Sequence, residues 1–131
     1  MQDATRLIAG IGLSSDVTLD EIECLVADAL VESAHPWEEL KVIATLDARR
    51  DHPALVAFTA RHGITLCGVA AGALAGVNVP NPSNAVGAHV GTESVAEAAA
   101  LLAGRATELL LPKRASAHAT VALAIIYEGV P

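Results

Sequence analysis

The sequence predicts an α/β domain of three layers, in which a mostly parallel or mixed five-stranded sheet carries helices on both faces. Through about the first seventy residues, short apolar runs alternate with amphipathic segments, which is the order of a β-α-β-α-β unit with right-handed crossovers. Two later apolar runs, 108–111 and 120–127, flank the polar residues 113–119 and predict a C-terminal hairpin. A length of 131 residues fits a single domain over residues 1–131 with one sizeable core.

The first strand is expected over residues 6–12, a continuous apolar run that ends in glycines. A helix is expected from Thr18, because Thr18 and Glu21 have the spacing of a capping box. The pair His35-Pro36 ends this helix. Its apolar stripe consists of Leu19, Ile22, Leu25, Val26, Ala29 and Leu30.

The second strand is expected over residues 42–46, followed by a charged loop over 47–51. Pro53 fits the first turn of a second helix, since its fixed φ suits that position. This helix ends at Gly63, and residues 64–69 form a third strand candidate. The connections are short, so these three strands are predicted to be parallel.

The central stretch of the chain predicts a stiff turn and then a helix. Pro82 crowds Asn81 out of the helical region, so the turn cannot be helical there. Thr92 or Ser94 then caps a helix, and Ser94 with Glu97 has capping-box spacing. We therefore expect Glu97 to serve the helix cap rather than to act as a general acid.

The same helix carries an apolar face and leads to two cations. Gly104 stands where a left-handed C-terminal residue is expected. A short strand then precedes Lys113 and Arg114, so the stretch supplies a turn, a helix N-terminus and cations, which together suit an anion. The apolar face consists of Val95, Ala98, Ala99 and Leu102.

Composition excludes several classes of function. The net charge of −7 and the pI near 5.0 argue against a nucleic-acid or anionic-membrane partner. No run is long and apolar enough to cross a bilayer, and the start has an acid where a signal peptide needs positive charge, followed by too short an apolar run. Cys24 and Cys67 are too few and too far apart for a disulfide framework or a CxxC site, so a reducing cytosol is expected. We expect no cofactor and no metal, because no metal-ligand spacing links the histidines, which are His35, His52, His62, His89 and His118.

Gly10 and Gly12 follow the first strand at the place where a phosphate-binding loop would lie. Ser15 replaces the third glycine of a GxGxxG motif, and Asp47 comes too late for the ribose-binding acid. Nucleotide binding is therefore the weakest alternative. The glycines either allow a tight turn or let a ligand approach the backbone, and we favour the close approach.

Basic residues gather on two predicted loops of this acidic chain. Arg49, Arg50, Lys113 and Arg114 are four of its eight Lys and Arg side chains. If both loops lie at the carboxyl end of the sheet with the glycines, they border the crevice where open α/β sheets bind ligands; otherwise they are solvated surface charges. Asp47 is the catalytic candidate as a general base, with an ion pair to a neighbouring arginine as the alternative.

Five motifs carry a resemblance to a known family. The chain contains, in order, GIG, ATLD, VPNPS, GTESVAEAAALL and LLLPKRASAHATVALA. This combination resembles the cobalamin-biosynthesis proteins CobE and the C-terminal domain of CbiG, over about residues 7–124. Arg49 matches the family's basic residue after its second strand, and Lys113 matches its lysine before the last strand. The family usually has Cys-Arg-Arg-Gly after GIG, where this chain has Leu13, Ser14, Ser15 and Asp16.

The resemblance implies a role in building the corrin ring. The expected ligand is an anionic corrinoid or precorrin intermediate, and other cobalamin-biosynthesis enzymes are possible partners. The alternative is a domain of a cobalt-precorrin-5A hydrolase, which opens a lactone, with Asp47 and the Lys113 loop as the reacting groups. The ligand-binding candidates are Gly10, Gly12, Thr45, Arg49, Asn81, Ser83, Ser94, Lys113 and Arg114.

Overall fold

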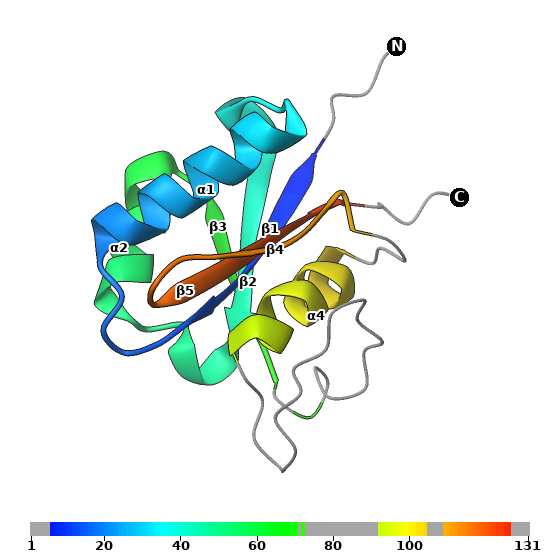
Figure 1. Cartoon of the computed structure of the whole chain (residues 1–131). Coiled ribbons are helices and arrows are strands. Elements are labelled where there is room, and N and C mark those ends of the chain that lie inside the picture. The colour runs from blue at the N-terminus through cyan, green and yellow to red at the C-terminus, as the bar shows by residue number, and fades with distance from the viewer. Residues whose placement is uncertain (1–5, 71, 73–91, 105–108, 127–131) are drawn as a thin grey trace.

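A computed structural model of the chain describes residues 6–70, 72, 92–104 and 109–126, and the structural statements below concern those residues. They form a five-stranded mixed sheet with the strand order β3-β2-β1-β5-β4 and helices on both of its faces, which confirms the predicted fold (Figure 1). The elements are β1 (Leu7–Leu13), α1 (Leu19–Ser33), η1 (Trp37–Glu39), β2 (Leu40–Leu46), η2 (Asp47–Arg49), α2 (Pro53–His62), β3 (Thr65–Val69), α4 (Thr92–Gly104), β4 (Leu111–Ala115) and β5 (Ala119–Ile125).

The directions of the strands place their carboxyl ends. Strand β1 is parallel to β2, and β2 is parallel to β3. Strand β5 is antiparallel to both of its neighbours, β1 and β4, so β4 and β5 form the predicted C-terminal hairpin. The carboxyl ends of β1, β2 and β3 therefore share one edge of the sheet, which we call the carboxyl edge; the opposite one is the amino edge.

The ends of the first two helices follow from local chemistry. At the start of α1, the Thr18 hydroxyl accepts a hydrogen bond from the Glu21 N–H at 3.2 Å, as the capping spacing predicts. Pro53 occupies the first turn of α2, where no backbone donor is needed. That helix ends at Gly63, whose φ of 64° is in the left-handed region.

The sheet has a different core on each face. Leucine, isoleucine, valine and Phe58 fill the space between the sheet and helices α1 and α2. Alanines dominate the other core, under α4, so this helix lies very close to the sheet. A Cβ atom on Gly10 would come within 2.0 Å of the Ala96 carbonyl oxygen. Helix α4 therefore leaves no room for a side chain at residue 10, and only glycine fits there.

Three expectations about α4 were wrong. Gly104 is the last residue of the helix and has no left-handed backbone; a Cβ there would lie 2.7 Å from Cγ2 of Ile8, so its small size serves packing. Leu102 is 38% exposed and does not share the buried face of its neighbours. Because α4 begins at Thr92, Ser94 lies inside the first turn and is not the residue that precedes the helix.

The first strand of the hairpin starts later than the sequence predicted. Lys113 and Arg114 lie within β4 rather than in the loop after it. The pairing of β4 with β5 is irregular between Leu111 and Arg114, where an extra residue forms a bulge. Pro112 has no N–H for a ladder bond, and an edge strand with a bulge is where such a residue is tolerated.

Candidate functional site

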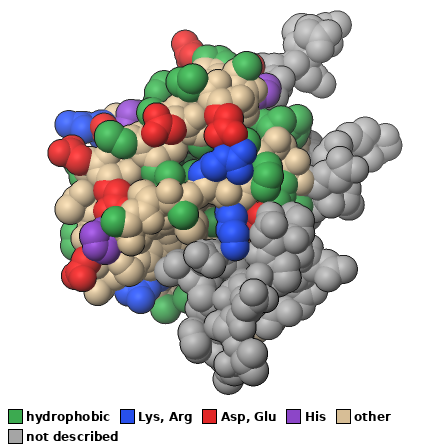
Figure 2. Space-filling model, viewed as in Figure 1, with side chains coloured by type: hydrophobic (Ala, Val, Ile, Leu, Met, Phe, Trp, Pro, Cys, Tyr) green, Lys and Arg blue, Asp and Glu red, His purple; other side chains and the backbone are tan. Residues whose placement is uncertain are grey.

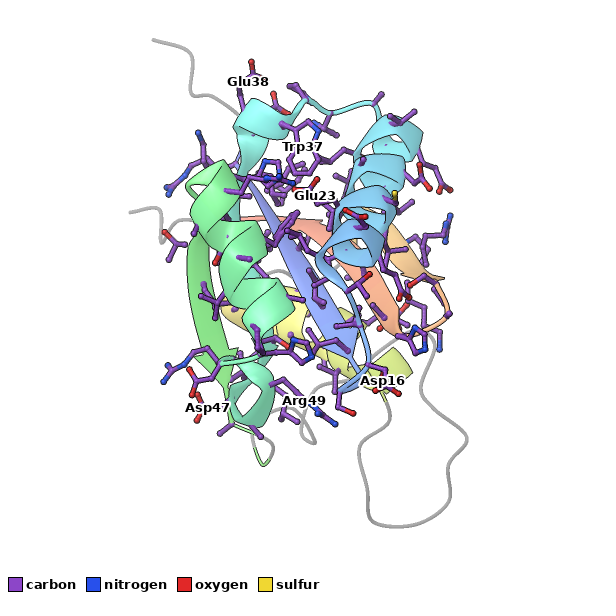
Figure 3. The ribbon with its side chains drawn as sticks, turned by 90° about the vertical axis from the view of Figure 1, so that its left-hand side faces the viewer. Asp16, Glu23, Trp37, Glu38, Asp47 and Arg49 are labelled. Atoms are coloured by element: carbon purple, nitrogen blue, oxygen red, sulfur yellow. The ribbon has the colours of Figure 1, made fainter. Side chains whose placement is uncertain are left out.

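The carboxyl edge of the sheet brings together part of the predicted site. Gly12 is the next-to-last residue of β1, and Asp47 and Arg49 form the ends of η2, directly after β2. Figure 3 shows Asp16, Arg49 and Asp47 along this edge, and Trp37 and Glu38 at the far end of the sheet. Gly10 and Gly12 lie inside β1 rather than in a turn after it, but the carboxyl end of β1 and the first basic loop lie at one edge, as expected.

Helix α4 points its N-terminus toward this edge. Ala96 lies against Gly10, and Gly104, eight residues later, lies against Ile8. The helix thus runs antiparallel to β1, and its Thr92 end is nearest the carboxyl end of that strand. The positive end of the helix dipole is directed to the same edge as Gly12.

Asp47 forms an ion pair with a neighbouring arginine. Its Oδ1 lies 3.6 Å from Nη1 of Arg50, and its side chain is 60% exposed. The carboxylate also lies over Gly68 of β3, where a Cβ atom would come within 2.4 Å of Oδ1. Of the two roles predicted for Asp47, the structure shows the ion pair with an arginine. The Asp47 carboxylate is nevertheless exposed to water.

Arg49 differs from its neighbour Arg50. It is half-buried, and no residue in the described part of the chain forms an ion pair or a side-chain hydrogen bond with it. By contrast, Arg50, Arg61 and Arg114 each have a carboxylate partner. A cation that loses part of its hydration and has no carboxylate partner is a good receptor for an external anion.

Thr45 and Gly10 have structural contacts that the sequence did not reveal. Thr45 is fully buried, and its hydroxyl donates a hydrogen bond to the Ile11 carbonyl at 2.7 Å. This bond joins β2 to β1 near the carboxyl edge. The backbone that approaches Gly10 is that of α4, as described above.

Lys113 and Arg114 lie in a strand that also ends at the carboxyl edge, because β4 and β1 are both antiparallel to β5 and so run parallel to each other. They lie in β4, which is three strands away from β2, or about 14 Å at the usual strand spacing. The Arg114 side chain turns to α1, where its Nε donates to both carboxylate oxygens of Glu32 at 2.9 and 3.1 Å. This contact lowers the pKa of Glu32 and raises the pKa of Arg114, because each charge stabilises the other. The second basic loop of the predicted site is therefore a strand with its own partners.

Glu97 has a role that the sequence analysis missed. Its side chain is fully buried, and its Oε2 accepts a hydrogen bond from the backbone N–H of Lys113 at 3.0 Å. The expected capping box is wrong, because α4 begins at Thr92 and Ser94 is therefore not the residue that precedes the helix. The Glu97 carboxylate instead reaches the β4 bulge. A charged residue within an alanine-rich helix was the signal, since charges are seldom fully buried without a partner.

His52 also escaped the sequence analysis. Its Nδ1 accepts a hydrogen bond from the Ala54 N–H at 3.1 Å, at the start of α2. Its Nε2 then carries the proton and donates to the Ser15 carbonyl at 2.9 Å. His52 therefore fixes the loop after β1, which borders the carboxyl edge beside η2.

Several remaining predictions have no structural outcome. Asn81 and Ser83 lie outside the described residues, and the Ser94 side chain is not described.

Among the described residues, no group of three or more His, Cys, Asp or Glu side chains could hold a metal ion. No helix in the described part has the length and apolar character needed to span a bilayer. Figure 2 shows acidic and basic side chains interspersed on the visible face, without a continuous basic field.

The chain matches a known family model over nearly its whole length. The model described as "Cobalamin synthesis G C-terminus" matches residues 7–124. A "Protein CobE" from Sinorhizobium sp. is 36% identical over 121 residues, which cover 90% of this chain and 79% of that protein. A "Cobalt-precorrin-5A hydrolase" from Priestia megaterium is 26% identical over 120 residues. This second match covers 92% of the chain but only 32% of the hydrolase.

Solved structures have the same fold. The crystal structure of CobE, described as a protein from the cobalamin (vitamin B12) biosynthetic pathway, superposes with a TM-score of 0.83 at 30% identity. The superposition covers 97% of this chain and 94% of that one. A cobalamin biosynthesis protein, chiG, from Agrobacterium tumefaciens has a TM-score of 0.67 at 29% identity, with 93% of this chain and 99% of that chain covered.

Proposed function

Because the chain belongs to the CobE and CbiG C-terminal family of cobalamin biosynthesis proteins, we propose that it binds an anionic corrinoid intermediate at the carboxyl edge of its parallel strands. A CobE-like role in cobalamin biosynthesis is the general function that family membership gives. The bound intermediate and the place of binding are the parts that we propose.

Arg49 is the observation that carries this proposal. Corrinoid intermediates have acetate and propionate groups around a broad ring, so a receptor for them needs cations or backbone donors. Arg49 is half-buried at the carboxyl edge and has no carboxylate partner among the described residues. Its guanidinium can give a ligand carboxylate two parallel hydrogen bonds.

The surroundings of Arg49 support the same ligand class. Gly12 is the next-to-last residue of β1 at this edge, and the N-terminus of α4 is directed toward it. Backbone N–H groups at a helix N-terminus favour a carboxylate. Asn81, Ser83 and Ser94 stay predicted contacts, since β3 ends and α4 begins at this edge.

A titration with hydrogenobyrinic acid tests the proposal. The visible absorption of the corrin reports binding to the purified protein. Arg49→Gln should weaken binding by about tenfold, because one charge-assisted contact is lost. Arg61→Gln removes the same charge from a residue that is paired with Glu23, and it serves as the control. Equal affinities for the wild type and Arg49→Gln would rule out the carboxyl edge as the site.

A hydrolytic role is a second candidate, which the match to a cobalt-precorrin-5A hydrolase favours. Asp47 would act as the general base, because its carboxylate is 60% exposed and can contact a water molecule. Lactone opening by the purified chain, lost in Asp47→Asn while corrin binding persists, would support this role. Binding without turnover in the wild type would leave the chain as a binding protein that acts beside other enzymes of the pathway.

A further inference from the structure

A second hollow lies at the amino edge of the sheet, far from Arg49. Its volume is about 440 Å³, and its lining comes from the residue before β1, the start of β2, the start of β3 and the end of α2. Figure 3 shows Trp37 and Glu38, which both line it, at the opposite end of the fold from Asp47. The charged and aromatic side chains of its lining are those of Arg6, Trp37, Glu38, Lys41 and His62.

The hollow has an aromatic wall. The rings of Trp37 and His62 stack with their centroids 4.4 Å apart and an interplanar angle of 5°. Phe58 packs against both rings from the core, at 6.0 Å from Trp37 and 4.8 Å from His62. The chain has one Trp, one Phe and one Tyr. Two of its three large aromatic residues, Trp37 and Phe58, therefore form or support this wall.

A network of hydrogen bonds holds the wall in place. The Nε2 atom of His62 lies 2.9 Å from Oε2 of Glu23 on α1, and Arg61 donates to the same oxygen at 3.0 Å. Both hydrogen bonds lower the pKa of Glu23, and the bond from Arg61 has the larger effect. Because His62 cannot turn without losing this bond, the indole of Trp37 rests on a fixed partner. A rigid aromatic surface binds a flat molecule without the entropy cost of ordering itself.

The rim of the hollow contains a cation, Lys41, that has no carboxylate partner among the described residues. Arg6 precedes β1 and Lys41 lies in the neighbouring strand β2, while Glu38 is the acid in the lining. Lys41 is exposed and forms no ion pair with any described residue. Arg6 has an interaction of its own, so Lys41 is the cation of this rim that can receive a carboxylate.

We propose that the amino-edge hollow is a second binding site, which takes a flat molecule bearing a carboxylate: the ring lies against the Trp37–His62 wall and the carboxylate faces Lys41. This site is independent of the corrinoid site at the carboxyl edge. The two share no residue, so each can fail without the other.

Nuclear magnetic resonance with a simple probe tests this site directly. Trp37 is the only tryptophan, so its indole N–H gives a single isolated signal. 2-Naphthoate is the probe, and 2-naphthylmethanol is its neutral match. We expect naphthoate to shift the Trp37 indole and Gly63 amide signals in a saturable way, and more tightly than the alcohol. In Lys41→Gln the naphthoate affinity should fall about two- to fivefold, the range for an exposed ion pair.

Two control variants distinguish this site from binding at the carboxyl edge and from nonspecific binding. Arg50→Gln removes one positive charge from the carboxyl edge and should leave naphthoate binding unchanged. In Trp37→Leu the Gly63 amide remains as the reporter, and its response should be lost. Three results would each overturn the proposal: no saturable shift at Trp37, shifts centred on Gly12 and Gly68, or equal affinity for naphthoate and the alcohol with no effect of Lys41→Gln.

Discussion

The carboxylate of Glu97 accepts a hydrogen bond from the Lys113 backbone N–H at 3.0 Å, and this bond joins the buried side of α4 to the bulge in β4. An edge strand with a bulge leaves backbone donors without a ladder partner. Glu97 supplies an acceptor at that place. The bulge in β4 therefore provides a donor for the buried Glu97 carboxylate, and Glu97 provides an acceptor for the bulge.

Replacing Glu97 should destabilise the fold according to what the new side chain can accept. Glu97→Ala leaves the Lys113 N–H unsatisfied and opens a cavity, which should lower the free energy of unfolding by about 3 kcal/mol. Glu97→Gln keeps an acceptor oxygen and should cost about 1 kcal/mol. Urea denaturation measures both, with the exposed Glu38→Gln as the control. Equal losses for Ala and Gln would mean that the hydrogen bond to Lys113 contributes little.

A methyl group at Gly10 should be poorly tolerated. A Cβ there would lie 2.0 Å from the Ala96 carbonyl oxygen and 2.6 Å from the Ala100 nitrogen, both of which are backbone atoms that cannot rotate away. Gly10→Ala should therefore cost about 3 kcal/mol or more, at the upper end for overpacking. Gly72→Ala is the matched control, because no described atom lies within 4 Å of its Cβ position. A thermal melt of Gly10→Ala that coincides with that of Gly72→Ala would contradict the close contact with α4.

The layers of the fold could be predicted from the sequence because each strand and helix carries a local signal. Apolar runs at residues 6–12 and 42–46 became the central strands β1 and β2, and Thr18 and Gly63 mark helix ends as expected. The hairpin was predicted as well, but its first strand was placed too early. The predicted run of 108–111 stops before Pro112, whereas an edge strand with a bulge can contain a proline.

The site could be predicted only in part, because long-range contacts decide the rest. Lys113 lies in β4, the outermost strand on the side of the sheet opposite β3, and no local sequence pattern predicts this strand order. The partner of Glu97 is sixteen residues away, and the spacing to Ser94 pointed to a cap instead. Trp37 and His62 are also distant in sequence, so their stack was invisible before the fold was known.

Lys113 gives a direct comparison between the site predicted from the sequence and the narrower site at the carboxyl edge. If the corrinoid binds near Arg49, Lys113→Ala should change its affinity by less than about twofold, because the residue lies three strands away. The same visible titration measures this. A loss in Lys113→Ala as large as that in Arg49→Gln would mean that the ligand extends across the sheet to β4, as the sequence predicted.

The pair formed by Glu32 and Arg114 should make stability depend on pH in the acidic range. The hydrogen bond from Arg114 lowers the pKa of Glu32 in the folded chain below its ordinary value of 4.5. A carboxyl group with a lowered folded-state pKa stabilises the fold above its unfolded pKa, and this contribution is lost as the pH falls through the folded pKa. Its loss should thus begin near pH 4.5 and continue below it. Both side chains are well exposed, so salt should weaken the effect.

The test compares urea midpoints at pH 7 and at pH 3 in the wild type and in Glu32→Gln. The variant cannot take up a proton at this position as the pH falls, so its stability should fall less steeply with acid than that of the wild type. Glu38→Gln provides the control, because Glu38 is exposed and has no ion pair with a described residue. Glu21 and Glu23, whose pKa values are also lowered by their partners, keep part of the acid dependence in every variant. An unchanged slope in Glu32→Gln would show that the contact between α1 and β4 is not maintained in solution.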